Sequence, residues 1–396
     1  RYYILAENLK KMNNYTTILK YLFLLAFPLF IISCDTDEED IPIQITVPAN
    51  YEFLRDGVST VSFSGQTTRL NQVDEIYGAL NSDSFTEAQI DKMFADGEGF
   101  ADATLNGTGK KVRSKTSAGC AAGNSTTQAQ FDEQIADFAN NVVPAWSNDA
   151  SAGVAGKLTD ATRSIHVNAK GHEIDQTFVK GLIGGMALDQ IVNNYLQPCQ
   201  LDSGTRKEDN TNGILSGDKN YTDMEHKWDE AFGYLYGQEE DAKRSDLGTA
   251  PNGKGTTLNK YFKKINDSNQ PGLAEIVFNA FKTGRAAIVA GDYQVRDAQA
   301  NIIKIHLSKV IGYKSVDYLN GYMSKMAAGN TADAFHALSE GYGFVMSLQF
   351  TNNGNNAPYY SKSEVDAMLA KMDDFWTVQD ADLTLMVNDI KSKFGI

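Results

Sequence analysis

The chain has 396 residues, a hydrophobic content of 42%, a mean hydropathy of −0.35 and a formal net charge of −14. It is long enough for one large globular domain or two modest ones. The acidic balance, with no run of Lys and Arg, argues against nucleic acid and anionic membrane surfaces as partners.

The first part of the chain is typical of an export signal. Residues 21–32 form an apolar run of signal-peptide length, shorter than the roughly 20 apolar residues that a membrane span needs. The run ends in Ile-Ile-Ser-Cys, which fits a lipobox with Cys34 as the lipidated residue. Met12 is the predicted start of translation. We therefore expect residues 1–33 to be a signal peptide with an upstream extension.

Residues 34–48 are expected to form a lipidated Cys and an acidic tether. The stretch Asp-Thr-Asp-Glu-Glu-Asp follows Cys34 directly, and such a charge run stays solvated. It resembles the lipoprotein export signals of Bacteroidota, which implies a lipid anchor in the outer membrane, facing the cell surface or, alternatively, the periplasm. Outside the cytoplasm Cys120 and Cys199 are able to form one disulfide, and the sequence leaves open whether they meet.

The body of the protein begins with a short extended segment. Residues 41–66 alternate between apolar and polar side chains, with a turn predicted at Asp56-Gly57. From about residue 67 the apolar spacing becomes helical. Residues 96–126 are rich in Gly, Ser, Thr and Ala and are predicted to form a long loop.

Helices dominate the rest of the sequence, and a short hairpin is expected within residues 150–170. Capping boxes at Thr86/Gln89 and Ser361/Glu364 mark two helix starts. The predicted helices after the loop are 127–143, 172–196, 221–236, 257–266, 272–290, 293–321, 332–350, 361–375 and 379–393. We therefore predict an all-α fold, with residues 49–396 as a single helical domain.

A short pattern occurs twice in this domain. Residues 226–234 and 336–344 both read His-x-x-x-Glu, a small residue, an aromatic residue, Gly, and an aromatic residue. Each copy lies in a predicted helix, so each His and its Glu lie on one helix face. The repeat predicts an internal duplication, with related halves at about 67–240 and 256–396.

Two interpretations of the repeated pattern remain open. In the first, imidazoles and carboxylates bind iron or another divalent metal, and the candidate ligands are His226, Asp229, Glu230, His336 and Glu340. In the second, each pair only orients a core histidine, while Gly233 and Gly343 allow close helix packing. If one copy binds metal, the first is favoured because it has more acidic residues.

Other charged residues have structural interpretations. Arg285, Asp292 and Arg296 are predicted to form a buried ion network at a helix break, with anion binding as the alternative. Glu173 at a helix start is interpreted as a capping residue. The sequence contains no recognised catalytic motif, so a metal-dependent hydrolase is the least favoured hypothesis.

Three segments carry a resemblance to a known family. Residues 224–237, 284–293 and 334–344 resemble the domain-of-unknown-function 4856 family of Bacteroidota surface lipoproteins, which has no established activity. A more distant similarity is to imelysin-like proteins, which are associated with iron uptake and have the signature Gly-x-His-x-x-Glu. Here the Gly is absent and Asp229 replaces the Glu, which puts direct metal ligation in doubt.

The resemblance implies an imelysin-like pair of pseudo-symmetric helical bundles after the short extended segment. It also implies a surface-anchored binding lipoprotein in metal acquisition, with iron as the first candidate. The alternative is an accessory lipoprotein without a metal site, which binds another protein such as a TonB-dependent-type outer-membrane receptor.

Overall fold

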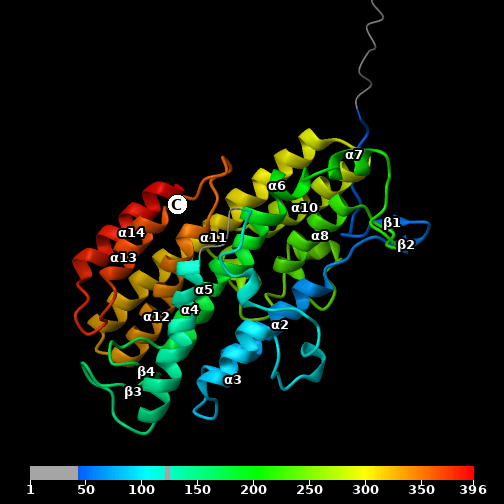
Figure 1. The fold of residues 1–396 in the computed structure, drawn as a ribbon. Helices are drawn as coiled ribbons and strands as arrows, with labels where there is room; N and C mark the ends of the chain where they lie inside the picture. Colours follow the sequence, from blue (N-terminus) through cyan, green and yellow to red (C-terminus); the bar gives the residue numbers. More distant parts are fainter. Residues whose placement is uncertain (1–42, 121–124) are drawn as a thin grey trace, which may run out of the picture. The chain divides into compact units, whose positions relative to one another are not determined.

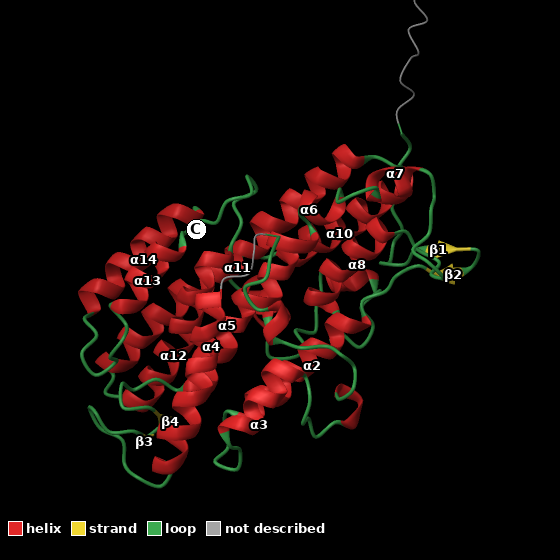
Figure 2. Cartoon of the chain, viewed as in Figure 1, coloured by secondary structure: helices red, strands yellow, loops and turns green. Residues whose placement is uncertain are grey.

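A computed structural model describes residues 43–120 and 125–396. Ile43–Ile396 forms one compact unit, and helices make up most of it (Figures 1 and 2). In the described part of the chain, the strands form two short antiparallel pairs. The all-α prediction is therefore confirmed. The predicted signal peptide and the predicted lipidation site at Cys34 lie outside the described residues. None of the helices described is both long and apolar enough to cross a membrane.

The N-terminal segment forms a small hairpin that leads into the first helix. Strands β1 (Leu54–Arg55) and β2 (Val58–Ser59) pair through the predicted turn, in which Asp56 and Gly57 have positive φ angles of 53° and 77°. Two positive φ angles in a two-residue turn match the right-handed twist of the strands. Helix α2 (Ser64–Ala79) begins three residues earlier than predicted.

The other elements up to α8 largely follow the prediction. They are α3 (Glu87–Asp91), η1 (Lys92–Asp96), η2 (Ala103–Leu105), η3 (Arg113–Lys115), α4 (Ser125–Asp137), η4 (Phe138–Val142), η5 (Val143–Ala145), β3 (Gly156–Thr159), β4 (Ser164–Val167), α5 (Ile174–Leu182), η6 (Ile183–Leu188), η7 (Gln190–Tyr195), α6 (Pro198–Leu201), α7 (Arg206–Thr211) and α8 (Asp223–Tyr236). Helix α7 was not predicted, because it buries no side chain and so has no apolar periodicity.

The C-terminal elements complete the bundle. They are η8 (Ser245–Gly248), α9 (Leu258–Asp267), α10 (Leu273–Ala290), α11 (Tyr293–Ala327), α12 (Thr331–Ser347), η9 (Leu348–Phe350), α13 (Lys362–Ala370) and α14 (Asp380–Phe394). Both predicted capping boxes, before α3 and before α13, are present. Helix α11 is six residues longer than predicted, and α13 ends five residues earlier.

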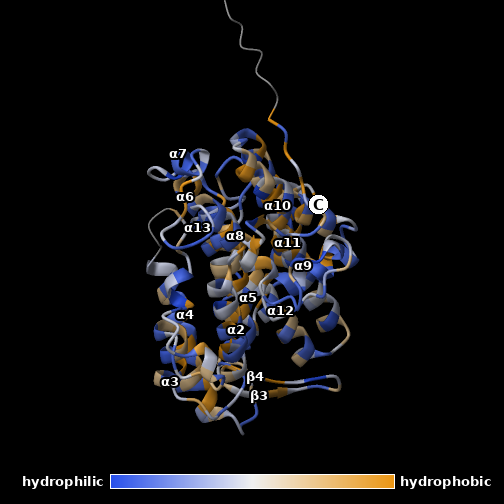
Figure 3. Ribbon diagram, turned by 90° about the vertical axis from the view of Figure 1, so that its right-hand side faces the viewer, coloured by the Kyte–Doolittle hydropathy of each residue, from blue (hydrophilic) through white to orange (hydrophobic). Residues whose placement is uncertain are grey.

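One continuous helical segment passes through the interior. Helix α5 continues without a break into the π-helical turns η6 and η7, and every residue from Ile174 to Val192 is buried. A helix that is buried all round is a core helix. This core helix packs against α12, and α12 packs against the long helix α11. Along many of the other helices hydrophilic and hydrophobic residues alternate, as expected of helices with one buried face (Figure 3).

The glycines of the repeated pattern permit close packing, as the second interpretation of the pattern expected. A Cβ atom on Gly343 of α12 would lie 2.4 Å from the Cβ atom of Lys180 on α5, and one on Gly233 of α8 would lie 2.4 Å from the Cβ atom of Phe63. Such distances are too short for two carbon atoms, so both positions need Gly.

The predicted halves share one hydrophobic core. Helix α5 from the first half packs on α12 from the second, and α8 packs on α10. The internal duplication and the pseudo-symmetric bundles stay predictions. A disulfide joins Cys120, before α4, to Cys199 in α6, which answers the question that the sequence left open.

Candidate functional site

Helix α8 carries the first copy of the pattern and presents two adjacent polar faces. Its first turn is fixed by a capping box between Thr222 and Glu225. Glu225 and Asp229 lie four residues apart and are 2% and 0% exposed. His226 and Glu230 occupy the neighbouring face, where they are partly exposed. The predicted ligands therefore do not converge on one point.

The buried face of α8 is occupied by an ion network. Arg285 of α10 is fully buried and contacts Glu225 Oε1 through Nη1 and Asp229 Oδ1 through Nε, both at 3.1 Å. Asp229 also accepts hydrogen bonds from the Tyr51 hydroxyl at 2.8 Å and the Ser62 amide at 3.3 Å. Burial raises the pKa of Asp229 to about 6, although Arg285 favours the carboxylate. The carboxylate oxygens of Asp229 are therefore already bound by Arg285, Tyr51 and Ser62.

The prediction that Arg285, Asp292 and Arg296 form one ion network is wrong. Arg296 pairs instead with Asp202 at 2.8 Å and Asp297 at 2.7 Å. Asp292 caps α11 by accepting a hydrogen bond from the Val295 amide at 3.0 Å. Each charge is satisfied within its own element or by a neighbour, so the helix break does not bring the three residues together.

The partly exposed face of α8 opens on a cavity of about 470 Å³, here called the cationic cavity. Five Lys or Arg side chains line it, against the single carboxylate of Glu230. The complete lining is Ser62, Ser64, Gly65, Gln66, Arg69, Lys110, Lys115, Tyr195, Lys219, Tyr221, His226, Lys227 and Glu230. A protein with a net charge of −14 thus concentrates positive charge in one hollow.

Three of the five cations have no acidic partner within the described part of the chain. Arg69 is 8% exposed and binds only the backbone carbonyls of Gly65 and Lys111, at 3.3 and 3.2 Å. Lys110 and Lys115 take part in no ion pair, whereas Lys227 contacts Glu230 at 2.6 Å. Burial lowers the pKa of the Lys115 amine, and neighbouring Arg69 adds to the effect. A buried charge without a counter-ion is costly.

The N-terminus of α2 adds a further positive potential. Ser64 and Gly65 belong to its first turn, which contains no acidic residue and no side-chain cap. Their amides have no hydrogen-bond partner in the part of the chain described. A Cβ atom on Gly65 would lie 3.3 Å from the Lys110 ammonium, so this cation lies close to the helix N-terminus. Two positive groups so close repel each other unless an anion lies between them.

His226 and Glu230 form the polar wall of the cationic cavity. The imidazole stacks on Tyr221 with ring centroids 4.7 Å apart, and its Nε2 lies 4.0 Å from Glu230 Oε1. Burial lowers the pKa of His226. Glu230 is already held by Lys227 and by Gln66 Nε2 at 3.0 Å. A metal cation would meet repulsion from the five Lys and Arg here, so these residues do not fit one.

The second copy forms an ion cluster on α12. His336 Nδ1 lies 2.6 Å from Glu173 Oε2, and its Nε2 lies 3.6 Å from Glu340 Oε2. Lys180 approaches Glu340 Oε1 to 3.6 Å, and the Tyr261 hydroxyl donates to the same atom at 3.1 Å. Glu173 is the N-cap residue of α5, at the helix start where it was predicted, but its carboxylate pairs with His336 and makes no cap hydrogen bond.

Over the described ranges 43–120 and 125–396, no group of three His, Cys, Asp or Glu side chains is placed to hold a metal ion. Both repeated pairs are instead joined to a lysine, Lys227 in the first and Lys180 in the second. Direct ligation by the predicted residues stays a prediction without support from this geometry.

Sequence reasoning missed the cations that line the cavity. Lys110 and Lys115 belong to one basic stretch, Lys-Lys-Val-Arg-Ser-Lys at residues 110–115, but Arg69 and Lys219 lie far from it in the sequence, so no local pattern shows that the four share a cavity. A second local signal is the first turn of α2, where an uncapped helix start carries no acid.

Comparisons with known proteins identify a family for the chain but indicate no activity or ligand. Among curated proteins and solved structures, nothing matches the chain. The profile of one family, described as "Domain of unknown function (DUF4856)", matches residues 48–396. Since the match covers the whole helical domain, the chain belongs to the DUF4856 family.

Proposed function

We propose that the protein is a non-catalytic binding lipoprotein, and that its ligand is a small multivalent oxyanion held in the cationic cavity. The observation that carries the proposal is the meeting of five basic side chains with one carboxylate. Export and a lipid anchor are supported by the lipobox at Cys34. The Cys120–Cys199 disulfide suits an oxidising compartment.

The free donors of the cavity define the ligand. Arg69 offers a guanidinium group, Lys110 and Lys115 offer ammonium groups, and the start of α2 offers amides. Phosphate and carboxylate oxygens are the natural partners of all three. The volume of about 470 Å³ lies within the range of about 300–1,000 Å³ for small-ligand sites. A di- or trianion fits better than a monoanion, because three cations need a counter-charge.

This proposal keeps the metal-acquisition role in a changed form. The cationic cavity repels a bare metal ion but attracts an anionic iron chelate such as ferric citrate. The protein would then bind iron through the chelating ligand, without His226 or Asp229 contacting the metal. The accessory role beside an outer-membrane receptor is compatible with such a ligand-capturing protein.

Isothermal titration calorimetry at low salt tests the proposal, with phosphate, sulfate, citrate and ferric citrate as probes. We expect at least one of them to bind. Lys110→Ala and Lys115→Ala should each weaken binding at least tenfold, since one charge-assisted contact is worth about 1.5–3 kcal/mol. Lys309→Ala is the matched control, because Lys309 is half-buried on α11 without an ion pair and does not line the cavity.

Each titration result has a defined meaning. Binding that resists added salt or survives both lysine substitutions would contradict the proposal, because exposed charges are screened by salt. Absence of binding by all four probes would also contradict the proposal. Equal affinity for citrate and ferric citrate would support the anion site but remove the link to iron.

The anchor is tested independently in cells. Cys34→Ser should abolish incorporation of labelled fatty acid and move the protein from the membrane fraction to the soluble fraction. A protein that stays in the membrane fraction without its cysteine would refute the proposed lipid anchor and leave the ligand proposal untouched.

A further inference from the structure

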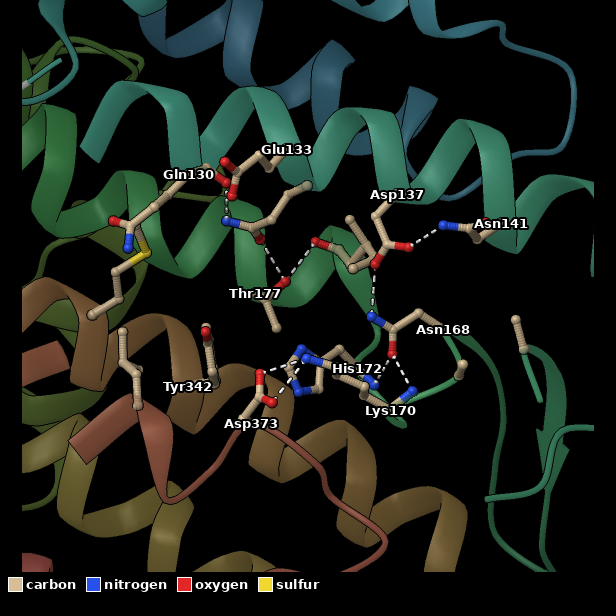
Figure 4. A pocket seen from close by; sticks show the side chains of 16 residues that line it. Gln130, Glu133, Asp137, Asn141, Asn168, Lys170, His172, Thr177, Tyr342 and Asp373 are labelled. Carbon is tan, nitrogen blue, oxygen red and sulfur yellow. Dashed lines mark hydrogen bonds and ion pairs between the residues drawn. The ribbon is translucent and has the colours of Figure 1, made fainter. Parts of the chain in front are cut away.

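A second cavity, chemically unlike the first, lies on another side of the core helix. It has a volume of about 630 Å³ and shares no lining residue with the cationic cavity. Helix α4 and its π-helical continuation η4 form one wall, residues 168–172 and the start of α5 form the base, and α12 closes the other side (Figure 4). π-helical turns are frequent at functional sites.

The polar wall of this cavity carries amides and carboxylates. Its amide side chains are Gln130, Gln134, Asn141 and Asn168, and its acids are Glu133, Asp137 and Asp373. We call it the amide cavity. Asp137 accepts hydrogen bonds from Asn141 and Asn168, both at 2.7 Å, so its charge is already stabilised.

The other two acids of the amide cavity differ in their surroundings. The Lys170 ammonium lies 2.8 Å from both oxygens of Asp373. Glu133 makes no ion pair or hydrogen bond within the described residues, but it is exposed, so water screens its charge. The lining has three carboxylates against one ammonium, and because Asp137 and Asp373 are already stabilised, no further cation is needed to hold them there.

Two buried polar atoms of the lining have no partner. His172 is 8% exposed, and its Nε2 makes no hydrogen bond among the described residues. Gln130 Oε1 on the opposite wall is also buried and unpaired. Burial lowers the pKa of His172 to about 4, so the imidazole is neutral at physiological pH. Burial of such groups without a partner is unfavourable, so a hydrogen-bonding occupant would stabilise them.

The facing wall is aromatic and apolar. The His172 ring lies 4.3 Å from Phe375 and 5.0 Å from Tyr342, measured between centroids. Ile174, Met346 and Leu369 complete this side. A wall of amides and carboxylates thus faces a wall of aromatic and aliphatic side chains, on which the C–H groups of a ligand are able to pack.

We propose that the amide cavity binds an uncharged, hydroxyl-rich small molecule of mono- or disaccharide size. Hydroxyl groups both donate and accept, so they satisfy Gln130 Oε1, His172 Nε2 and Glu133 together. The C–H face of a sugar ring packs on Tyr342. This site is separate from the oxyanion site and does not depend on it.

Saturation-transfer NMR and calorimetry on the folded protein test this site, with glucose, galactose, N-acetylglucosamine, maltose and lactose as neutral probes. Glucosamine and glucuronate serve as charged probes. We expect at least one neutral sugar to bind, and Gln130→Ala and Tyr342→Ala each to weaken it at least tenfold. Tyr342→Phe should weaken it less, because it keeps the ring. Lys115→Ala should leave sugar binding unchanged.

The possible results separate the explanations. Absence of binding by every neutral sugar at millimolar concentration would overturn the proposal and leave ordered water as the occupant. Tighter binding of glucosamine or glucuronate than of the neutral sugars would overturn the assignment of an uncharged ligand. Binding that survives both Gln130→Ala and Tyr342→Ala would place the sugar elsewhere. Loss of sugar binding in Lys115→Ala would contradict the independence of the two sites.

Discussion

Arg285 joins three separate parts of the chain through one fully buried side chain. It contacts Glu225 and Asp229 on α8 and donates a hydrogen bond to Thr60 at 2.9 Å. Arg55, on the hairpin, holds the other oxygen of Glu225 at 3.1 Å. The network thus fixes the N-terminal hairpin segment to the helix that lines the cationic cavity.

Replacement of Arg285 should be strongly destabilising. Arg285→Ala leaves buried carboxylates without their guanidinium, and we expect a loss of about 3–5 kcal/mol in the free energy of unfolding. Urea denaturation measures this loss. The control is Arg113→Ala, because the Arg113–Asp132 pair is about one-third exposed and should contribute less than about 1 kcal/mol. Similar losses in both variants would contradict the assigned role of the buried network.

His172 should make stability depend on pH. Its folded-state pKa of about 4 lies below the ordinary value of 6.5, so between these values the unfolded chain binds more protons. Stability therefore falls as the pH drops from about 6.5 to about 4, by about 3 kcal/mol from this residue alone. The test compares the wild type with His172→Phe at pH 7 and pH 4. A stability difference that is the same at both pH values would show that folding does not lower the pKa of His172.

At the scale of elements, the contact between α5 and α12 depends on small residues. Gly343 approaches the backbone of Lys180 and Gly181, and the Ser347 hydroxyl donates to the Lys180 carbonyl at 2.9 Å. This hydrogen bond satisfies a backbone carbonyl inside the buried core helix. This close contact also brings Lys180 next to Glu340 in the second copy of the repeated pattern.

A methyl group at this contact should force the helices apart. We expect Gly343→Ala to destabilise the protein by about 1–3 kcal/mol, as overpacked core substitutions do. The control is Gly321→Ala in α11, where the nearest atom lies 3.9 Å from the added Cβ. That change should stabilise by about 0.4–1 kcal/mol through helix propensity and backbone entropy. Thermal unfolding should therefore show a lower Tm for Gly343→Ala and a higher Tm for Gly321→Ala than for the wild type.

For the molecule as a whole, the disulfide is the one covalent cross-link among the described residues. It joins positions 79 residues apart. By the loop-entropy relation, closing such a loop stabilises the folded state by about 4 kcal/mol. Denaturation with and without reductant should show a loss of that size, and the Cys120→Ser/Cys199→Ser double variant should reproduce it. A double variant as stable as the oxidised protein would contradict the expected contribution.

The sequence by itself determined the elements and their class. Helical apolar spacing located the long helices, capping boxes located the starts of α3 and α13, and the glycines of the repeated pattern indicated close packing. These features depend on interactions within a few residues, which a linear pattern records. Helix α7 escaped detection because nothing in it is buried.

Only the tertiary structure decided the chemistry of the cavities. The sequence offered His226 and Asp229 as partners, but a helix turns about 100° per residue, so Asp229 faces Arg285 while His226 faces the cations. Lys110 and Lys115 meet Lys227 through packing of elements more than a hundred residues apart. His172, just before α5, and Gln130 of α4 likewise line one cavity. Such charges and unpaired atoms come together through long-range contacts, which no local pattern contains.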